Sequence, residues 1–392
     1  MAFTPSIGDV LRASVASDGH LPEDVVARLS PRKLAGLTQA ARFHGIPGYV
    51  YRAVSEIDRV PAAERDLIVA LRRETVRRHL RAIGDLRFLA DVLESAGIPW
   101  LVFKGPALAG VHGPPDLRYY NDLDVLVPAG RFGEVVRLLE AAGCRVPLHD
   151  WAYLRDGLKG EIDVFLPSGT HLDLHWHLLN EIPTRQPYRI DLDAVFSRRR
   201  DVTIGSDRFP TLAPLDAAVH VALHALLSPT QRLVGMKDLQ VLIEVSPLSQ
   251  HALLGHARSW GAELPVRTAL FKMERSIGTI PAIALEPPRG AERLWDGVCR
   301  FANRLTPLER QDGTASLGRL VARSVRGDVN ASLALLVRNA GIVVTRGSQA
   351  GIRTPQARLA SSTDPARGPV EPDNTHEREE YFAAVEAQAG RS

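Results

Sequence analysis

The sequence predicts an α+β protein in which a small mixed sheet with its helices is flanked by an N-terminal and a C-terminal helical region. Apolar residues recur at helical spacing through the first 90 residues and again after residue 205. Between these regions, short apolar or alternating runs bounded by glycine and proline are typical of strands. The chain has 392 residues, of which 45% are hydrophobic, so it is long enough to bury a large core and to form two or three domains.

Four segments are expected along the chain. Residues 1–90 form a helical N-terminal region, in which the later leucines keep helical spacing. Residues 91–205 form the core, where helix and strand patterns alternate and one helix ends at Gly143. Residues 206–345 return to helical patterns and form a C-terminal domain. A ligand is expected between this domain and the core, because clefts at domain interfaces commonly bind ligands.

The last segment, residues 346–392, is rich in Gly, Ser, Pro, Thr and charged residues, a composition that predicts disorder. Within it, the stretch from His376 to Ala389 fits a short amphipathic helix that carries Tyr381 and Phe382, although a helix this short is marginal in water on its own. A docking role for this helix is a hypothesis. We expect the fold to survive removal of residues 346–392.

Two aspartates lie two residues apart in a run of branched apolar residues that extends to Val127. In a strand, residues two apart point to the same face, so the carboxylates of Asp122 and Asp124 would lie side by side. Like charges this close repel each other unless both bind a hard cation, and Mg²⁺ prefers carboxylate oxygens together with water and substrate phosphates. Solvated loop residues are the alternative for an isolated pair, so the surrounding sequence decides the interpretation.

A layout suited to phosphate binding precedes this pair. Residues 98–103 predict a buried strand, which runs into Lys104 and Gly105 and then into a short helix from Pro106 to about His112. Gly105 would let the backbone approach a phosphate without a Cβ in the way, and Lys104 would add positive charge. The helix N-terminus would present free N–H groups. An ordinary tight turn is the alternative for the Lys-Gly pair alone.

A predicted β-hairpin follows, with strands over residues 161–166 and 171–176 and a Pro-Ser-Gly-Thr turn between them. The polar residues of the second strand, including Asp173, share one face and leave the apolar face free to pack. Asp173 is the preferred third carboxylate because its neighbours on that face are also polar. Asp163 of the first strand is the alternative, and a solvent-facing charge at the rim is the other interpretation of Asp163.

Further residues extend the pattern over most of residues 30–250. They are Leu86, Leu89, Leu93, Gly97, Ile98 and Pro99 before the aspartate pair, and Gly143, His220, His224, Arg232, Leu233, Lys237, Asp238 and Leu239 after it. Together with Lys104-Gly105, Arg118, Asp122-Leu123-Asp124 and Leu172-Asp173-Leu174-His175-Trp176, they resemble the uncharacterised bacterial nucleotidyltransferase family within the DNA polymerase β-like superfamily.

The resemblance implies a polymerase β-like nucleotidyltransferase core and the residues of its site. Asp122, Asp124 and Asp173 would bind two Mg²⁺ ions, while Gly105 and the helix after it would hold the β and γ phosphates of an NTP, with ATP among the candidates. An acceptor hydroxyl would attack the α-phosphorus in line and release pyrophosphate. One metal ion would lower the pKa of this hydroxyl, and the other would neutralise the leaving group.

Two features depart from the superfamily pattern. Lys-Gly stands where Gly-Ser or Gly-Gly is usual at the turn, and sixteen residues separate Gly105 from Asp122, which is more than the usual gap.

Four other residues have roles that the sequence leaves open. Arg118 precedes the aspartate pair by four residues, where its planar guanidinium would reach a phosphate oxygen, and a surface arginine is the equal alternative. His220 and His224 have the i, i+4 spacing of a zinc pair without the Glu of HExxH, so a packed pair between domains is favoured over a metal site. His175 would orient the third carboxylate or touch substrate, with a backbone-bonded histidine as the alternative.

Composition limits the compartment and the partners. Two cysteines, Cys144 and Cys299, exclude a disulfide framework and a four-cysteine zinc site, so the cytoplasm is the expected compartment. No signal-peptide pattern is present and no apolar run approaches the roughly 20 residues needed to span a bilayer, so no membrane partner is expected. The formal net charge of +3 suits a triphosphate, whereas a nucleic-acid partner is not favoured. The oligomeric state is not specified.

Three functions are compatible with this pattern. The first is a Mg²⁺-dependent nucleotidyltransferase that places an NMP on a hydroxyl or phosphate of a small molecule, peptide or protein, and the three carboxylates favour it. An RNA-end-directed, toxin-like transferase would need a stronger basic track. A degenerate nucleotide-binding scaffold has no reason to keep three desolvated like charges. The acceptor is not specified, although related families occur in bacterial biosynthetic clusters, where they would tailor a product.

Overall fold

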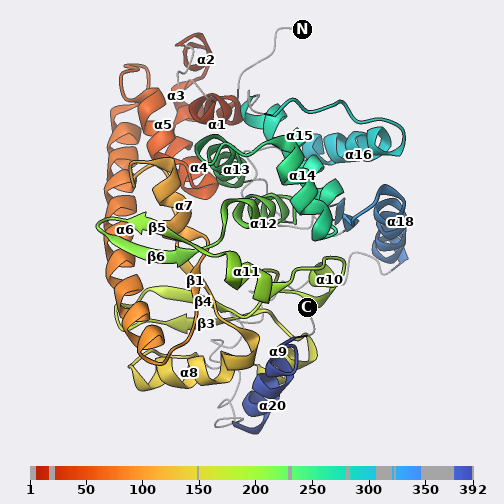
Figure 1. Cartoon of the computed structure of the whole chain (residues 1–392). Coiled ribbons are helices and arrows are strands. Elements are labelled where there is room, and N and C mark those ends of the chain that lie inside the picture. Colours follow the sequence, from red (N-terminus) through yellow and green to blue (C-terminus); the bar gives the residue numbers. More distant parts are fainter. Residues whose placement is uncertain are drawn as a thin grey trace.

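A four-stranded mixed sheet lies between two groups of helices (Figure 1). The computed structural model describes residues 6–16, 23–147, 150–227, 232–278, 283–305, 320–321, 324–345 and 375–390. The strands are β1 (Leu101–Val102), β2 (Asp122–Leu126), β3 (Glu161–Phe165) and β4 (His171–His175), in the spatial order β1-β2-β4-β3. β2 and β4 run parallel, whereas β1 and β3 pair antiparallel with their neighbours. The expected α+β class is therefore confirmed.

A second sheet of two antiparallel strands lies beside β1. It consists of β5 (Arg200–Ile204) and β6 (Asp207–Thr211), which are joined by a tight turn at Gly205. The Thr211 hydroxyl donates to the Val102 carbonyl over 2.6 Å, which ties this hairpin to the edge of the main sheet.

Helical regions flank the sheet, as the sequence predicts. On the N-terminal side they are α1 (Ile7–Val15), α2 (Glu23–Ala27), α3 (Pro31–Leu34), α4 (Leu37–His44), α5 (Pro47–Val54) and α6 (Ala62–Ser95). On the C-terminal side they are α12 (Pro214–Leu227), α13 (Leu233–Val245), α14 (Gln250–Ser259), α15 (Glu263–Ile277), α16 (Ala291–Leu305) and α18 (Val329–Thr345). The long helix α6 runs along one side of the molecule and joins the N-terminal helices to the sheet (Figure 1).

The remaining helices lie within or beside the sheet region. They are α7 (Gly105–His112), η1 (Ala129–Arg131), α8 (Phe132–Ala141), α9 (Trp151–Asp156), α10 (Ile182–Arg185), α11 (Leu192–Arg198) and α20 (Thr375–Glu386). The predicted short helix after Gly105 and the predicted hairpin are both present as α7 and as β3 with β4. The predicted strand over residues 98–103 is shorter than expected, because only β1 pairs with β2 before the chain turns at Gly105.

The two faces of the main sheet carry different residues. Leu123 and Leu172 are fully buried on one face, where they pack with α6 and α8 in one hydrophobic cluster. Leu101 and Leu126 belong to a second cluster, which contains the N-terminal helices together with α12 and α13. Strand alternation places the polar residues of β2 and β4 on this second face, so the site faces the helical regions.

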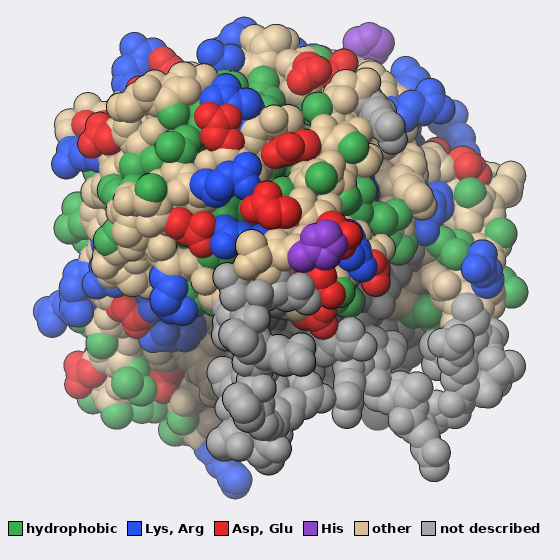
Figure 2. All heavy atoms as spheres, turned by 90° about the horizontal axis from the view of Figure 1, so that it is seen from below, with side chains coloured by type: hydrophobic (Ala, Val, Ile, Leu, Met, Phe, Trp, Pro, Cys, Tyr) green, Lys and Arg blue, Asp and Glu red, His purple; other side chains and the backbone are tan. Residues whose placement is uncertain are grey.

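The C-terminal segment departs from the expectation of a dispensable tail. The predicted helix is present as α20, which lies against α8 and α9 (Figure 1). Figure 2 shows this end of the molecule from below. Tyr381, Phe382 and Val385 are buried within the same cluster as the sheet. Removal of residues 346–392 would expose this part of the core, whereas the predicted disorder of residues 346–374 lies outside the described residues.

In the part of the chain that the structure describes, none of the helices combines the length and apolar character needed to cross a bilayer.

Candidate active site

The parallel pairing of β2 with β4 brings the predicted carboxylates together. Asp124 lies in register with Asp173, and Asp122 lies in register with His171. Paired residues on adjacent strands point to the same side of a sheet, so these side chains share one face. The antiparallel strand β3 adds Asp163, which lies opposite Asp173.

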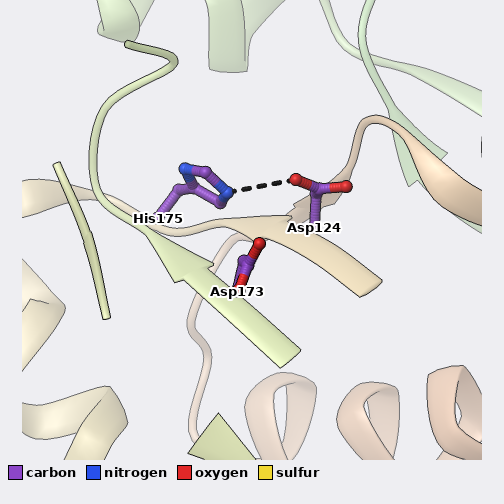
Figure 3. A group of neighbouring side chains, drawn as sticks. All are labelled: Asp124, Asp173 and His175. Carbon is purple, nitrogen blue, oxygen red and sulfur yellow. Dashed lines mark hydrogen bonds and ion pairs between the residues drawn. The ribbon is translucent and has the colours of Figure 1, made fainter. Parts of the chain in front are cut away.

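Asp124, Asp173 and His175 gather over β2 and β4, as Figure 3 shows. Their ligand atoms all lie within 4.8 Å of one another, a spacing that fits one metal ion. Asp163, His171 and Asp173 form a second group of the same size, which shares Asp173 with the first. Both groups combine carboxylate oxygens with an imidazole nitrogen.

Asp122 lies on the same face but belongs to neither compact group. Burial raises the pKa of Asp122, and the charge of Asp124 raises it further. Burial likewise raises the pKa of Asp173 to about 7, with Asp124 as the next cause. Burial and the Asp124 charge therefore disfavour the ionised forms of Asp122 and Asp173, and a bound cation would favour them.

Lys104 is paired with one of the predicted ligands. Its Nζ lies 2.6 Å from Oδ1 of Asp124, and its side chain is largely buried. Burial alone would lower the pKa of Lys104, but the Asp124 carboxylate outweighs burial and raises it. Burial also opposes ionisation of Asp124, yet Lys104 and His175 outweigh burial and hold the pKa of this carboxyl far below its usual range. Asp124 is thus ionised, and Lys104 is its counterion.

His175 bridges two carboxylates at the end of β4. Its Nε2 lies 3.3 Å from Oδ1 of Asp124, and its Nδ1 lies 3.1 Å from Oε2 of Glu161. Burial would lower the pKa of His175, but Glu161 and Asp124 outweigh burial and raise it. The amide of Asn180 donates to Glu161 and fixes its other oxygen. His175 therefore contacts side chains rather than only backbone.

Glu161 is a site residue that sequence reasoning missed. It begins the first strand of the predicted hairpin and lies directly opposite His175. The turn defines this register, so the hairpin pattern contained the signal that could have identified Glu161.

Gly105 lies at the first position of α7, where the chain leaves β1. Its φ of +45° is in the left-handed region, which favours glycine. A Cβ at this position would lie 3.1 Å from the carbonyl oxygen of Asp122, so the turn and the aspartate strand approach each other closely. Gly105 therefore combines a positive φ with a close approach to the carboxylate strand.

Arg118 is buried, so it is not a surface arginine, and its guanidinium holds other groups in this structure. Its Nε and Nη2 donate to the two oxygens of Asp238 over 2.7 and 2.9 Å, and its Nη1 donates to the Gly105 carbonyl over 3.2 Å. A direct contact between Arg118 and a phosphate would require this ion pair to open. Arg118 instead connects the α7 turn to α13.

Asp238 connects further helices to this turn. His112, at the end of α7, contacts Oδ1 of Asp238 through Nε2 over 2.7 Å and the Tyr49 hydroxyl through Nδ1 over 2.8 Å. Both side chains of the Arg118–Asp238 pair are almost fully buried. The sequence pattern included Asp238, but it carried no signal that Arg118 is its partner, 120 residues earlier.

His220 and His224 both lie on α12, where His220 is buried and His224 is exposed. The ring centroid of His220 is 5.1 Å from that of Phe103, and the two histidine rings are 6.1 Å apart. Burial lowers the pKa of His220 well below its usual value, so His220 is neutral. Neither histidine belongs to a possible metal group among the described residues.

No curated protein matches the sequence. Among solved structures, the chain is similar to the lincosamide antibiotic adenylyltransferase LnuA with lincomycin bound, at 14% identity over 41% of this chain and 96% of that chain, with a TM-score of 0.29. It is also similar to an antigenic nucleotidyltransferase-like protein from Paracoccidioides brasiliensis, at 17% identity over 50% of this chain and 92% of that chain, with a TM-score of 0.29.

Both TM-scores are too low to support an argument about fold or function. The family comparison is stronger because it covers the sheet, α7, α12 and α13 together. Residues 30–276, which make up more than half of the chain, match the family described as uncharacterised nucleotidyltransferase, so the chain belongs to this family and is a nucleotidyltransferase.

Proposed function

We propose that this nucleotidyltransferase uses Mg²⁺ to transfer an NMP from an NTP to a hydroxyl or phosphate of an acceptor, with release of pyrophosphate. The observation that carries the proposal is the pairing of β2 with β4, which gathers Asp124, Asp173 and His175 on one sheet face within 4.8 Å. The acceptor class proposed is a small molecule, peptide or protein, including the product of a biosynthetic cluster.

The donor set fits Mg²⁺. Oxygen ligands from a few carboxylates, completed by water and substrate phosphates, suit this ion. The raised pKa values of Asp122 and Asp173 also fit, because burial and the neighbouring Asp124 charge disfavour their ionised forms and a bound cation would offset both effects. When bound, Mg²⁺ would supply charge neutralisation for the pyrophosphate and acidify the attacking hydroxyl. We propose that Asp122, Asp124 and Asp173 hold the metal ions.

The other residues would orient these ligands and the triphosphate. His175, which also contacts Glu161, lies against Asp124, and Lys104 donates to the same carboxylate. We propose that the Lys104 ammonium turns towards the phosphates when the nucleotide binds, and that Gly105 lets the α7 backbone approach them. Arg118 would keep the Gly105 carbonyl in place during this approach.

We also propose that residues 91–205 act as the catalytic core and residues 206–345 as the domain that covers it. The buried His220 of α12 and the buried Asp238 of α13 support this division, because they contact Phe103 and Arg118 of the core. The acceptor would bind between these two parts.

Calorimetric titration with each of the four NTPs, with and without Mg²⁺, tests the proposal. The wild type should bind an NTP only with Mg²⁺, and Asp124→Asn should abolish this binding. Asp207→Asn is the matched control. Asp207 lies on β6, away from this face, and pairs with Arg87 of α6. Thermal unfolding should show that both variants fold. Failure of the wild type to bind any NTP, or equal binding by Asp124→Asn, would contradict the proposal.

A further inference from the structure

The C-terminal helix α20 packs through one face onto α8 and α9. Tyr381, Phe382 and Val385 lie at positions i, i+1 and i+4, so they share a helix face, and each is at most 1% exposed. The ring centroid of Trp151 is 5.9 Å from that of Tyr381 and 5.7 Å from that of Phe382. This is core packing, although α20 follows α18 only after residues 346–374.

Charges of both signs cross this interface. Arg137 of α8 pairs with Glu379 over 3.0 Å, and Arg155 of α9 pairs with Glu380. In the opposite sense, Arg378 of α20 pairs with Glu140 of α8. Figure 2 shows basic and acidic side chains interleaved on the face seen from below. Because α20 carries both acidic and basic partners in these ion pairs, a different orientation of the helix on α8 and α9 would bring like charges together.

The receiving surface also contains a glycine where the helices meet. A Cβ at Gly133, in the first turn of α8, would lie 3.0 Å from Oε1 of Glu386 and 3.1 Å from Phe382. Contacts this short would push α20 outward. The absence of a side chain at Gly133 therefore permits the close approach of α20.

One residue of α20 reaches the strands of the site. The Tyr381 hydroxyl donates to the carbonyl of Lys159 over 2.7 Å, and the indole N–H of Trp176 is shared between that carbonyl at 2.6 Å and the Tyr381 oxygen at 3.3 Å. Lys159 lies two residues before Glu161, and Trp176 immediately follows His175. Tyr381 thus anchors both chain segments that carry the Glu161–His175 pair.

The backbone completes this connection. The amide of Trp176 donates to the Gly160 carbonyl over 2.9 Å, and the amide of Gly160 donates to the Asn180 carbonyl over 2.8 Å. Asn180 in turn donates to Glu161 through its side chain. Movement of the anchored segment would therefore displace Glu161 relative to His175.

We propose that α20 completes the site from behind the sheet and that Tyr381 is a positioning residue for Glu161 and His175. This inference rests on the proposed function, because it assigns His175 to the orientation of Asp124. A second interpretation is that α20 only stabilises the fold. The two differ in whether the Tyr381 hydroxyl has an effect that its ring does not have.

The test uses the full-length chain with Tyr381→Phe, which keeps the ring and removes the hydroxyl, and Val385→Ala as the matched control. Val385 is fully buried on the same helix, but no hydrogen bond connects it to Lys159 or Trp176. Hydrogen–deuterium exchange is measured at the amides of Gly160 and Trp176. Thermal unfolding records the stability of each variant, and Mn²⁺ binding is followed by electron paramagnetic resonance.

Tyr381→Phe should speed exchange at these two amides by about fivefold to tenfold, the scale expected for loss of one buried hydrogen bond. It should also weaken Mn²⁺ binding by about threefold or more, which corresponds to a fraction of the free energy of one buried hydrogen bond. Val385→Ala should lower the melting temperature at least as much and leave both quantities within about twofold of wild type, because it removes packing alone.

Unchanged exchange in Tyr381→Phe would overturn the inference, and so would equal acceleration in Val385→Ala, which is the result expected for a purely stabilising helix. A wild type that binds no Mn²⁺ would contradict the metal-dependent function. The exchange measurement would still decide the positioning role in that case, so the two failures are distinguishable.

Discussion

Removal of the Asp238 carboxylate should be among the most destabilising single substitutions in this protein. The side chains of Arg118 and Asp238 are 8% and 4% exposed. Asp238→Ala would leave the guanidinium inside the protein with the Gly105 carbonyl as its remaining partner, 3.2 Å away. His112 would also lose its acceptor. The substitution thus leaves a buried charge without a counter-charge.

The expected magnitude follows from this geometry. Breaking a buried ion pair by removing one partner costs about 3–5 kcal/mol, whereas exposed pairs contribute about 0–1 kcal/mol. A domain has about 5–15 kcal/mol of stability in total, so the loss would be a large fraction of it. Burial opposes ionisation of Asp238, but the Arg118 guanidinium outweighs burial and holds the pKa of this carboxyl well below its usual range.

This pKa direction fixes the pH dependence. A carboxyl whose pKa is lower in the folded state contributes its stability above the unfolded pKa of about 3.9 and loses it as the pH falls through the folded pKa. The destabilisation by Asp238→Ala should therefore be complete at pH 7. It should shrink only in strong acid.

Urea unfolding at pH 7 of the wild type, Asp238→Ala, Arg118→Met and the double variant measures the pair. The double variant should be more stable than Asp238→Ala alone, because it removes the stranded charge, and the coupling should reach about 2 kcal/mol. Asp207→Ala, which breaks an exposed pair with Arg87, is the control and should cost at most about 1 kcal/mol. A loss below about 1 kcal/mol in Asp238→Ala, or additivity within about 0.5 kcal/mol, would refute the reasoning.

Three further predictions concern the site. Lys104→Met should destabilise the metal-free protein by about 1–3 kcal/mol, because buried Asp124 loses its counterion, and Mg²⁺ should reverse this loss in thermal unfolding. Gly105→Ala should cost about 1–2 kcal/mol and weaken NTP binding in calorimetry, more than Gly97→Ala, whose position also has positive φ but open space around the Cβ. Mn²⁺ affinity should rise about tenfold per pH unit below the Asp173 pKa of about 7 and level off above it, because a protonated carboxyl cannot bind the metal. A flat profile of affinity between pH 5.5 and 8.5, roughly one and a half units to either side of this pKa, would contradict the prediction.

Local patterns in the sequence predicted much of the sheet face. The alternation around Asp122 and Asp124 and the hairpin that carries Asp173 both depend on the two-residue period of a strand. The positive φ of Gly105 also has a local signal, because a glycine there begins a helix after a strand. These features need only neighbouring residues, so one sequence contains them.

The partners of these residues depend on long-range packing. Arg118 meets Asp238, and Trp176 meets Tyr381, which lies 205 residues later in the chain. No spacing rule connects residues so far apart, so Arg118 was expected at a phosphate or on the surface. The buried position of α20 could not be predicted for the same reason. An isolated helix of this length is marginal, and α20 is stabilised by a surface that forms only in the folded protein.

The two faces of the sheet explain how the fold tolerates an electrostatically unfavourable site. One face is a continuous apolar layer that includes Leu123, Leu172 and, through α20, Phe382. The opposite face holds Asp122 and Asp173 with raised pKa values, which means that ionising them costs free energy in the metal-free protein. A scaffold would gain stability by replacing these carboxylates with neutral residues. The proposed cation would explain their presence together with Lys104 and His175, which favours an active nucleotidyltransferase over a degenerate one.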